Sequence, residues 1–254
     1  MRLCLSRHER EAENVTDSRS KRRDEAAPRK AAPPFRRRLV VMVKVPVAGC
    51  VKTRLARQVG TVRATSFYRH ASAAVLARVQ APRVWQTLLA VTPDTGRFHR
   101  CWPPHIMRIA QGRGDLGQRM QCIMSRHLPG PVVIIGTDIP AVRPTYIGAA
   151  FSALGQHDAV LGPAHDGGYW LVGLKRRPHV MNAFRNVRWS SAHALEDTMA
   201  NLAGYRVARA IALGDVDDPH ELARSSCWSG RRVLPAQLSA GGSALPMDRL
   251  VGSG

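Results

Sequence analysis

The sequence is poor in acidic residues, with 18 Asp and Glu against 38 Lys and Arg and a formal net charge of +20. A chain this basic indicates a polyanionic partner, such as nucleotide phosphates, nucleic acid or an anionic membrane surface. A high arginine content set by genome composition is the alternative explanation. Residues 39–254 hold only twelve acids, and six of them fall within four short turns. We therefore expect acids to stand where an oxygen ligand is needed.

Paired cysteines and long apolar runs are also missing. The five cysteines are scattered with no CxxC spacing, which argues against a disulfide framework or a zinc site and is typical of a reducing compartment. No apolar run approaches the ~20 residues that span a bilayer. Residues 36–50 resemble a lipoprotein signal ending at Cys50, but Lys44 and Pro46 interrupt its apolar stretch. We expect a cytoplasmic protein with no membrane partner.

The composition changes twice along the chain. Residues 1–36 are charged and lack apolar periodicity, so we predict a disordered basic extension, with an overcalled start site as the alternative. Residues 225–254 are rich in Gly, Ser and Pro, which predicts a loosely structured tail. The remaining segment, 37–224, is predicted to be a single folded domain.

Apolar patterns within this domain alternate between strand and helix. Strands are expected at 39–45, 84–91, 106–110, 132–135, 158–161, 169–174 and 205–213, and helices from about 53, then at 61–80, 115–128, 145–154 and 191–202. Such alternation predicts an α/β, Rossmann-like fold with a mostly parallel mixed sheet and helices on both faces. Ligands of such sheets bind beyond the carboxyl ends of the strands.

A basic turn follows the first expected strand. It contains Lys44, Gly49, Lys52, Thr53 and Arg54, and a helix begins near its end. Backbone N–H groups at a helix N-terminus favour anions, and an arginine can bind phosphate oxygens in bidentate fashion. The spacing matches neither a Walker A loop nor GxGxxG. The turn predicts a phosphate-binding segment, with a solvated basic turn as the alternative.

Asp138 follows the apolar strand expected at 132–135, so the strand delivers a carboxylate to the edge of the sheet. A carboxylate there suits Mg²⁺ or Mn²⁺, which also bridge phosphate oxygens. The alternative is an N-cap. The next helix is expected to begin near Pro144, six residues further on, which makes the cap the weaker interpretation.

Glycines and acids gather in three further turns. Asp166, Gly167, Gly168 and Tyr169 follow another strand, and paired glycines permit close approach of a ligand or simply a tight hairpin. Gly114 and Asp115 open a helix, where Asp115 is either a cap or part of a nucleotide site. Acids at 215, 217 and 218 form the last turn, in which a helix cap accounts for position 218.

With these residues in view, the chain resembles the cofC-like bacterial glycosyltransferases, some of which are linked to arsenosugar biosynthesis and to neighbouring radical-SAM genes. Six ordered motifs carry the resemblance, at residues 44–56, 114–120, 136–140, 162–174, 189–191 and 215–222. Departures are Ala48, Gln118 and Ile139, where the family has Pro, Glu and Ser.

The resemblance implies a GT-A-like fold of the nucleotide-diphospho-sugar transferase superfamily. By the same resemblance, Lys52 and Arg54 contact nucleotide phosphates and Asp138 holds the divalent metal. Asp166 and the adjacent glycines face the sugar or the acceptor.

Three functions are consistent with these features. The first is a metal-dependent transferase that uses a nucleotide-sugar donor and a small-molecule acceptor. The second is a nucleotidyltransferase, which uses the same basic turn and metal but releases pyrophosphate from a nucleoside triphosphate. The third is a basic nucleic-acid-binding protein, but no basic stripe interleaved with aromatics is present, so no specific nucleic acid is expected.

Overall fold

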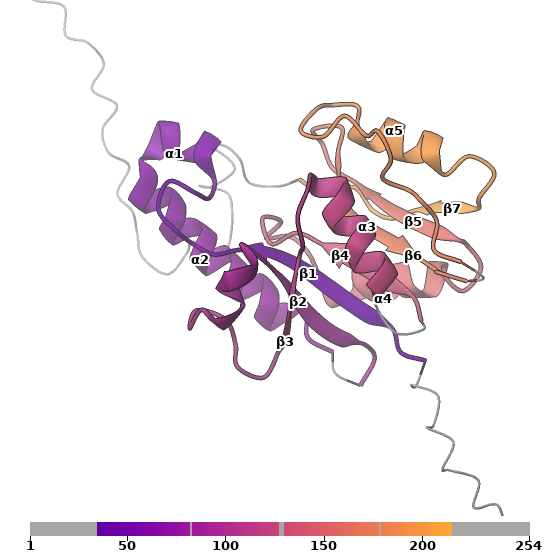
Figure 1. The fold of residues 1–254 in the computed structure, drawn as a ribbon, viewed down its shortest axis with the longest axis horizontal. Helices are drawn as coiled ribbons and strands as arrows, with labels where there is room; N and C mark the ends of the chain where they lie inside the picture. Colours follow the sequence, from indigo (N-terminus) through magenta and orange to yellow (C-terminus); the bar gives the residue numbers. More distant parts are fainter. Residues whose placement is uncertain (1–34, 82, 127–129, 178, 215–254) are drawn as a thin grey trace, which may run out of the picture. The chain divides into compact units, whose positions relative to one another are not determined.

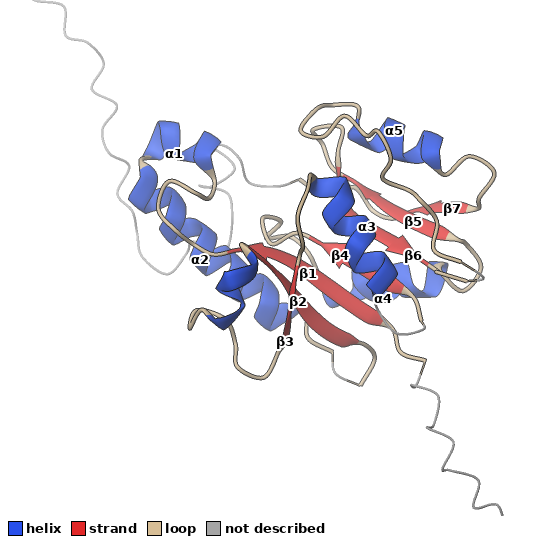
Figure 2. Ribbon diagram, in the orientation of Figure 1, coloured by secondary structure: helices blue, strands red, loops and turns tan. Residues whose placement is uncertain are grey.

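The computed structural model describes residues 35–81, 83–126, 130–177 and 179–214. They form a seven-stranded sheet in the order β3-β2-β1-β4-β6-β5-β7 (Figures 1 and 2). The strands are β1 (Arg38–Lys44), β2 (Gln86–Thr92), β3 (Met107–Ala110), β4 (Val132–Ile135), β5 (Ala159–Pro163), β6 (Tyr169–Leu174) and β7 (Val207–Arg209).

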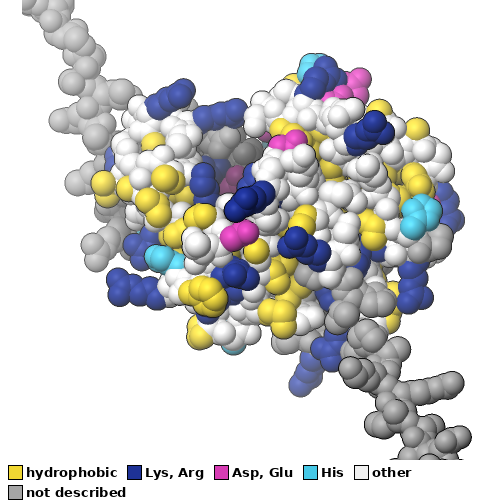
Figure 3. Space-filling model, in the orientation of Figure 1, with side chains coloured by type: hydrophobic (Ala, Val, Ile, Leu, Met, Phe, Trp, Pro, Cys, Tyr) yellow, Lys and Arg dark blue, Asp and Glu magenta, His cyan; other side chains and the backbone are white. Residues whose placement is uncertain are grey.

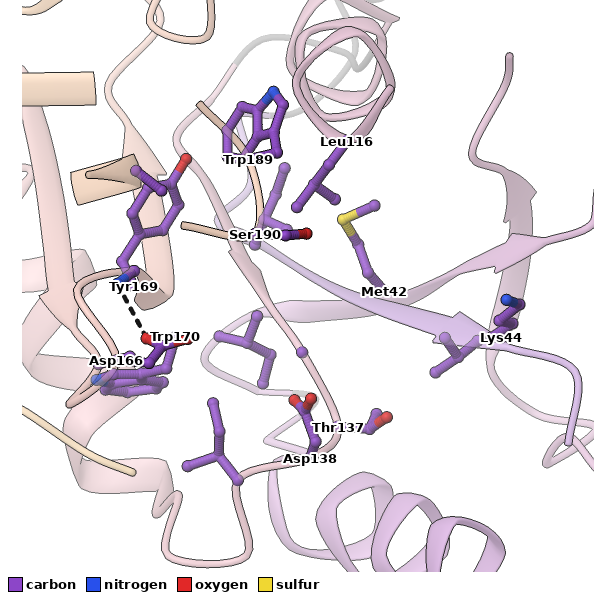
Figure 4. Close-up of a pocket in the computed structure, with 18 of the residues that line it drawn as sticks. Met42, Lys44, Leu116, Thr137, Asp138, Asp166, Tyr169, Trp170, Trp189 and Ser190 are labelled. Carbon is purple, nitrogen blue, oxygen red and sulfur yellow. Dashed lines mark hydrogen bonds between the residues drawn. The ribbon is translucent and has the colours of Figure 1, made fainter. Parts of the chain in front are cut away.

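Strand direction brings several chain segments to one edge of the sheet. Strands β3, β2, β1 and β4 are parallel neighbours, so they end at the same edge. Strand β6 is antiparallel to β4 and to β5, and therefore begins where β4 ends. The start of β6 at Tyr169 thus lies beside the loops that follow β1 and β4. Figure 4 shows residues of these segments facing a common space.

Helices cover both faces of the sheet (Figure 2). The helices of the described residues are α1 (Thr53–Val59), α2 (Thr61–Arg78), α3 (Leu116–Arg126), α4 (Pro144–Ala153), α5 (Ala194–Asn201) and a short 3₁₀ helix, η1 (Asp94–Phe98), and α1 packs against α2. Val75 and Leu76 of α2 and the apolar residues of α4 share one core cluster with the odd-numbered residues of β1, whereas those of α3 pack with the even-numbered ones. This arrangement explains the continuous apolar run of β1, since both of its faces are buried.

The structure confirms the predicted fold class. Four of the six strand pairs are parallel, namely β1·β2, β1·β4, β2·β3 and β5·β7, and two are antiparallel. Helix α5 begins at Ala194 rather than at residue 191, because the Ser191 Oγ accepts a hydrogen bond from the His193 N–H in a turn before the helix. Strand β7 is shorter than the predicted 205–213, and η1 was not predicted.

Several predictions lie outside the described residues. They are the extension at 1–36 except for its last two residues, the tail at 225–254 and the acidic turn at 215–222. Within the described ranges, no helix is both long and apolar enough to cross a membrane.

Candidate active site

A cleft of about 710 Å³ lies at the edge of the sheet where β1 and β4 end and β6 begins. Small-molecule pockets have volumes of roughly 300–1,000 Å³, so the cleft is large enough for such a ligand. It receives side chains from the basic turn, the loop after β4, the turn before β6, the start of α3 and the segment 189–192. Of the predicted site residues, those that line it are Lys44, Lys52, Thr53, Arg54, Asp138, Asp166, Gly168 and Tyr169.

Lys52 and Asp138 form the centre of the polar part of the cleft. The Lys52 ammonium lies 3.2 Å from the Asp138 carboxylate, and the Lys52 side chain is 7% exposed against 38% for Asp138. Lys52 precedes α1 with a left-handed backbone, φ 46° and ψ 48°. A non-glycine residue is strained in this region and persists only where its surroundings enforce it. The turn therefore holds a cation directly against the predicted metal ligand.

Helix α2 supports both strand ends beneath this pair. The Tyr68 hydroxyl accepts a 2.8 Å hydrogen bond from the Lys44 N–H at the end of β1. The Ser72 hydroxyl donates to the Thr137 hydroxyl, 3.1 Å away, next to Asp138. Burial raises the pKa of the Tyr68 phenol, so this group stays neutral. Buried, satisfied hydrogen bonds of this kind fix the position of the polar residues above them.

The turn before β6 is built around Asp166. Its Oδ1 accepts a 2.9 Å hydrogen bond from the Gly168 N–H. Gly167 has φ +84°, and a Cβ there would lie 2.2 Å from the Ala192 carbonyl oxygen. The Gly167 carbonyl in turn accepts a hydrogen bond from the Leu195 N–H at the start of α5. Glycine is thus required for close packing of the turn against segment 189–192, which explains Gly167 without a ligand.

Gly114 and Asp115 are not among the residues that line the cleft. Asp115 Oδ1 accepts from the Gln118 N–H at 2.7 Å, and Gln118 Oε1 accepts from the Asp115 N–H at 3.0 Å. This reciprocal pair is a capping box for α3. The glutamine at position 118 serves this box as well as a glutamate does. Gly49 is also absent from the lining, so roles of Gly49, Gly114 and Asp115 in nucleotide binding stay predictions.

Sequence reasoning missed an apolar group in the same cleft. Met42, Leu116 and Trp189 line it together with Ser190, as Figure 4 shows. Ser190 has φ 58°, and it and Lys52 are two of the four described non-glycine residues with positive φ. The Trp-Ser-Ser motif at 189–191 was the available signal, but it suggested no chemical role. Two strained residues in one cleft are typical of a functional site.

The charges in the cleft suit a phosphate ligand with a divalent cation. Three cations, Lys44, Lys52 and Arg54, line it with two carboxylates, Asp138 and Asp166, which leaves a formal charge of +1. Among the described residues, no group of three or more His, Cys, Asp or Glu side chains could hold a metal by itself. Mg²⁺ is usually bound by one or two carboxylates and substrate phosphates, so the residues present fit a metal that binds together with a nucleotide.

Comparison with known proteins finds solved structures with a similar fold. A solved structure from Desulfovibrio desulfuricans, assigned as a nucleotide-diphospho-sugar transferase, is 28% identical with a TM-score of 0.68 and covers 77% of this chain and 93% of that chain. The chain is similar to nucleotide-diphospho-sugar transferases. This similarity confirms the superfamily expected from the six motifs. A family model described as "Uncharacterized protein conserved in bacteria (DUF2064)" matches residues 75–191.

More distantly similar solved structures were also found. One is 4-diphosphocytidyl-2C-methyl-D-erythritol synthase from Anaerococcus prevotii, at 8% identity and a TM-score of 0.49, covering 78% of this chain and 99% of that one. Another is the inositol-1-phosphate CTP transferase from T. maritima, at 11% identity and a TM-score of 0.43, covering 75% and 92%. These scores are too low to bear on the activity of this chain. No curated protein matches the chain at a significant level.

Proposed function

We propose that the protein is a metal-dependent transferase that moves a sugar from a nucleotide-sugar donor to a small-molecule acceptor. The observation that carries the proposal is the Lys52–Asp138 pair, a cation and a carboxylate 3.2 Å apart at the carboxyl edge of the sheet. The similarity to the nucleotide-diphospho-sugar transferase from Desulfovibrio desulfuricans supports the donor class. The same residues suit a nucleotidyltransferase, which is kept as the alternative outcome of the test.

In this proposal the basic residues and the two carboxylates of the cleft have separate tasks. Lys52 and Arg54 bind the diphosphate of the donor, and Asp138 holds Mg²⁺ or Mn²⁺ with it. The metal supplies Lewis-acid stabilisation of the negative charge on the departing diphosphate. Asp166 accepts a hydrogen bond from the attacking hydroxyl of the acceptor and then its proton, while Gly168 donates to the same carboxylate and orients it.

The surface charge gives less support to a nucleic-acid-binding function. On the face shown in Figure 3, the described Lys and Arg side chains are spread among neutral and apolar ones. A nucleic-acid site collects its cations along a groove or on one face. Scattered cations raise the local concentration of anionic ligands of any kind.

Thermal shift with nucleoside diphosphates, triphosphates and nucleotide sugars, with and without Mn²⁺, tests the proposal. A ligand that binds only the native state at 100 times its Kd stabilises it by about 2.7 kcal/mol. We expect metal-dependent stabilisation in the wild type and its loss in Asp138→Asn. Glu196→Gln is the matched control, because this side chain is 75% exposed on α5.

Product analysis then separates the two kinds of transfer. Release of a nucleoside diphosphate from a nucleotide sugar supports sugar transfer, whereas release of pyrophosphate from a triphosphate supports nucleotidyl transfer. If no nucleotide stabilises the wild type under any condition, both enzymatic functions are refuted.

A further inference from the structure

One half of the cleft is apolar. Its floor is formed by Met42, Ile134 and Val172 on the adjacent strands β1, β4 and β6, and its walls include Leu116 and Trp189. In Figure 4, Leu116, Met42 and Trp189 are drawn on one side of the cleft, and Asp138 and Asp166 on the other. The cleft therefore joins a charged half to an apolar half within one space.

The Trp189 wall is held rigidly. A Cβ at Gly117 would lie 2.7 Å from the indole, so the start of α3 packs directly against this ring. Tyr169 meets the ring edge-on at a centroid distance of 6.3 Å, and Phe184 lies at 6.4 Å. The indole is only partly buried, so part of it remains accessible. A fixed, partly exposed aromatic ring binds without the entropy cost of ordering a mobile one.

Leu116 is exposed although it lies in a cleft. Its exposure is 37%, and it is one of nine exposed large apolar side chains of the described residues. The capping box of Asp115 and Gln118 fixes the residue at the start of α3. Neither α3 nor the sheet needs this side chain for its core. Apolar surface in a concave site beside reactive polar groups is typical of ligand recognition.

We propose that the apolar half binds the acceptor, and that this acceptor carries an apolar ring or branched chain next to its reacting hydroxyl. The inference rests on the proposed function. In the reaction, the hydroxyl oxygen forms a bond to the anomeric carbon while the bond from that carbon to the diphosphate breaks. The electron pair leaves with the diphosphate, and the proton passes to Asp166. Selectivity comes from Leu116, Met42 and Trp189, which exclude polyhydroxylated acceptors by leaving their hydroxyls without partners.

Two ring alcohols of the same carbon skeleton provide the test. Cyclohexanol has one hydroxyl, and myo-inositol has six. Binding of each is measured by calorimetry on the full chain, with and without saturating UDP or GDP and Mg²⁺. The wild type is expected to bind cyclohexanol about tenfold or more tightly than myo-inositol, the scale of a small apolar group in a matching pocket.

Variants at position 116 distinguish binding in the apolar half from nonspecific binding to apolar surface. Leu116→Gln keeps the side-chain size and removes its apolar character, and Leu116→Trp fills the apolar half. Both are expected to abolish the preference for cyclohexanol. Val62→Gln is the control, because Val62 is 78% exposed on α2 and does not line the cleft. Unchanged preference in both Leu116 variants would overturn the proposal.

Measurements with and without the nucleotide show whether the apolar half binds the acceptor or the nucleobase. If cyclohexanol binds only in the absence of the nucleotide, the apolar half belongs to the nucleobase and the acceptor assignment is wrong. Equal affinity for the two alcohols also overturns it. If no nucleotide of the thermal-shift panel binds, the proposed donor chemistry fails, and the acceptor assignment fails with it. Nucleotide binding without any cyclohexanol preference refutes the acceptor assignment alone.

Discussion

At the scale of single residues, the cleft depends on a few side chains with backbone geometry that their residue type does not favour. Lys52 and Ser190 both have positive φ, and both line the cleft. Lys52 also lies where a metal bound to Asp138 would compete with it, because the ammonium is 3.2 Å from the carboxylate. The metal-free site therefore contains a cation of its own.

Lys52→Met is expected to change metal and nucleotide binding in opposite directions. Without the competing ammonium, Mn²⁺ alone should bind Asp138 about tenfold more tightly, equivalent to roughly 1.4 kcal/mol. Nucleoside diphosphate should bind more weakly, because a phosphate contact is lost. Titration of free Mn²⁺ by electron paramagnetic resonance measures the first effect without any enzyme assay. Lys175→Met, at the far end of β6, is the control, and unchanged Mn²⁺ affinity in Lys52→Met would contradict the competition.

Gly167→Ala is expected to destabilise the protein. A left-handed backbone costs an L-residue about 1–2 kcal/mol, and the new Cβ would also lie 2.2 Å from the Ala192 carbonyl oxygen. Urea unfolding measures the loss. Gly148→Ala is the matched control within α4, where no atom lies within 4 Å of the added Cβ, and it should gain up to about 1 kcal/mol. Equal stability of the two variants would show that the turn rearranges freely.

At the scale of elements, the strands could be predicted well because buried parallel strands are continuous apolar runs. The first residue of α5 and the extent of β7 could not be predicted, because they depend on local turns. The charged half of the site was predicted from the sequence because acids are scarce. Its apolar half was not, because Met42, Ile134 and Leu116 have the same residue types as the core and only their position shows that they line a cleft.

Helix α5 is tied to the Trp189 segment by an ion pair with a pH-dependent contribution. Asp197 accepts hydrogen bonds from the Arg188 guanidinium at 2.7 and 2.9 Å and from the Arg188 N–H at 2.9 Å. These bonds lower the pKa of Asp197 to about 2 from 3.8. A depressed pKa contributes stability above pH 3.8 that is lost as the pH falls toward 2.

Asp197→Asn is therefore expected to lose less stability than the wild type when the pH is lowered from about 4 to about 2. Thermal unfolding at several pH values across this window gives the comparison. Glu196→Gln, the neighbouring carboxylate, should leave the wild-type slope nearly unchanged. If the stability of Asp197→Asn fell with pH as steeply as that of the wild type, other groups would be responsible for the acid sensitivity.

At the scale of the whole molecule, most of the net charge lies outside the N-terminal segment. Residues 1–34 hold 9 basic and 6 acidic residues, so +3 of the net +20 comes from this segment and +17 from the remainder. Among the described residues, those that line the cleft lie between Met42 and Ala194. Deleting residues 1–34 should thus leave nucleotide affinity within about twofold while it reduces salt-sensitive retention on DNA.

The full chain and the truncated chain are compared by filter binding of DNA at two salt concentrations. Calorimetry with a nucleotide on both proteins gives the nucleotide affinity. Loss of nucleotide binding on truncation would place part of the site in the removed segment. Undiminished DNA retention would place the DNA-binding surface on the remainder of the chain.

The reversal of β6 has a consequence for how such a protein can change its chemistry. Because β6 runs antiparallel to β4, the turn at Asp166 lies at the edge of the sheet where β4 ends. This turn and the segment around Trp189 come from a later part of the chain than the basic turn and Asp138. Under the proposed function, substitutions around Trp189 can alter one wall of the acceptor site while the basic turn and Asp138, which handle the donor, stay unchanged. The acceptor range of this scaffold should consequently be open to redesign, or to evolutionary drift, without rebuilding the machinery for the leaving group.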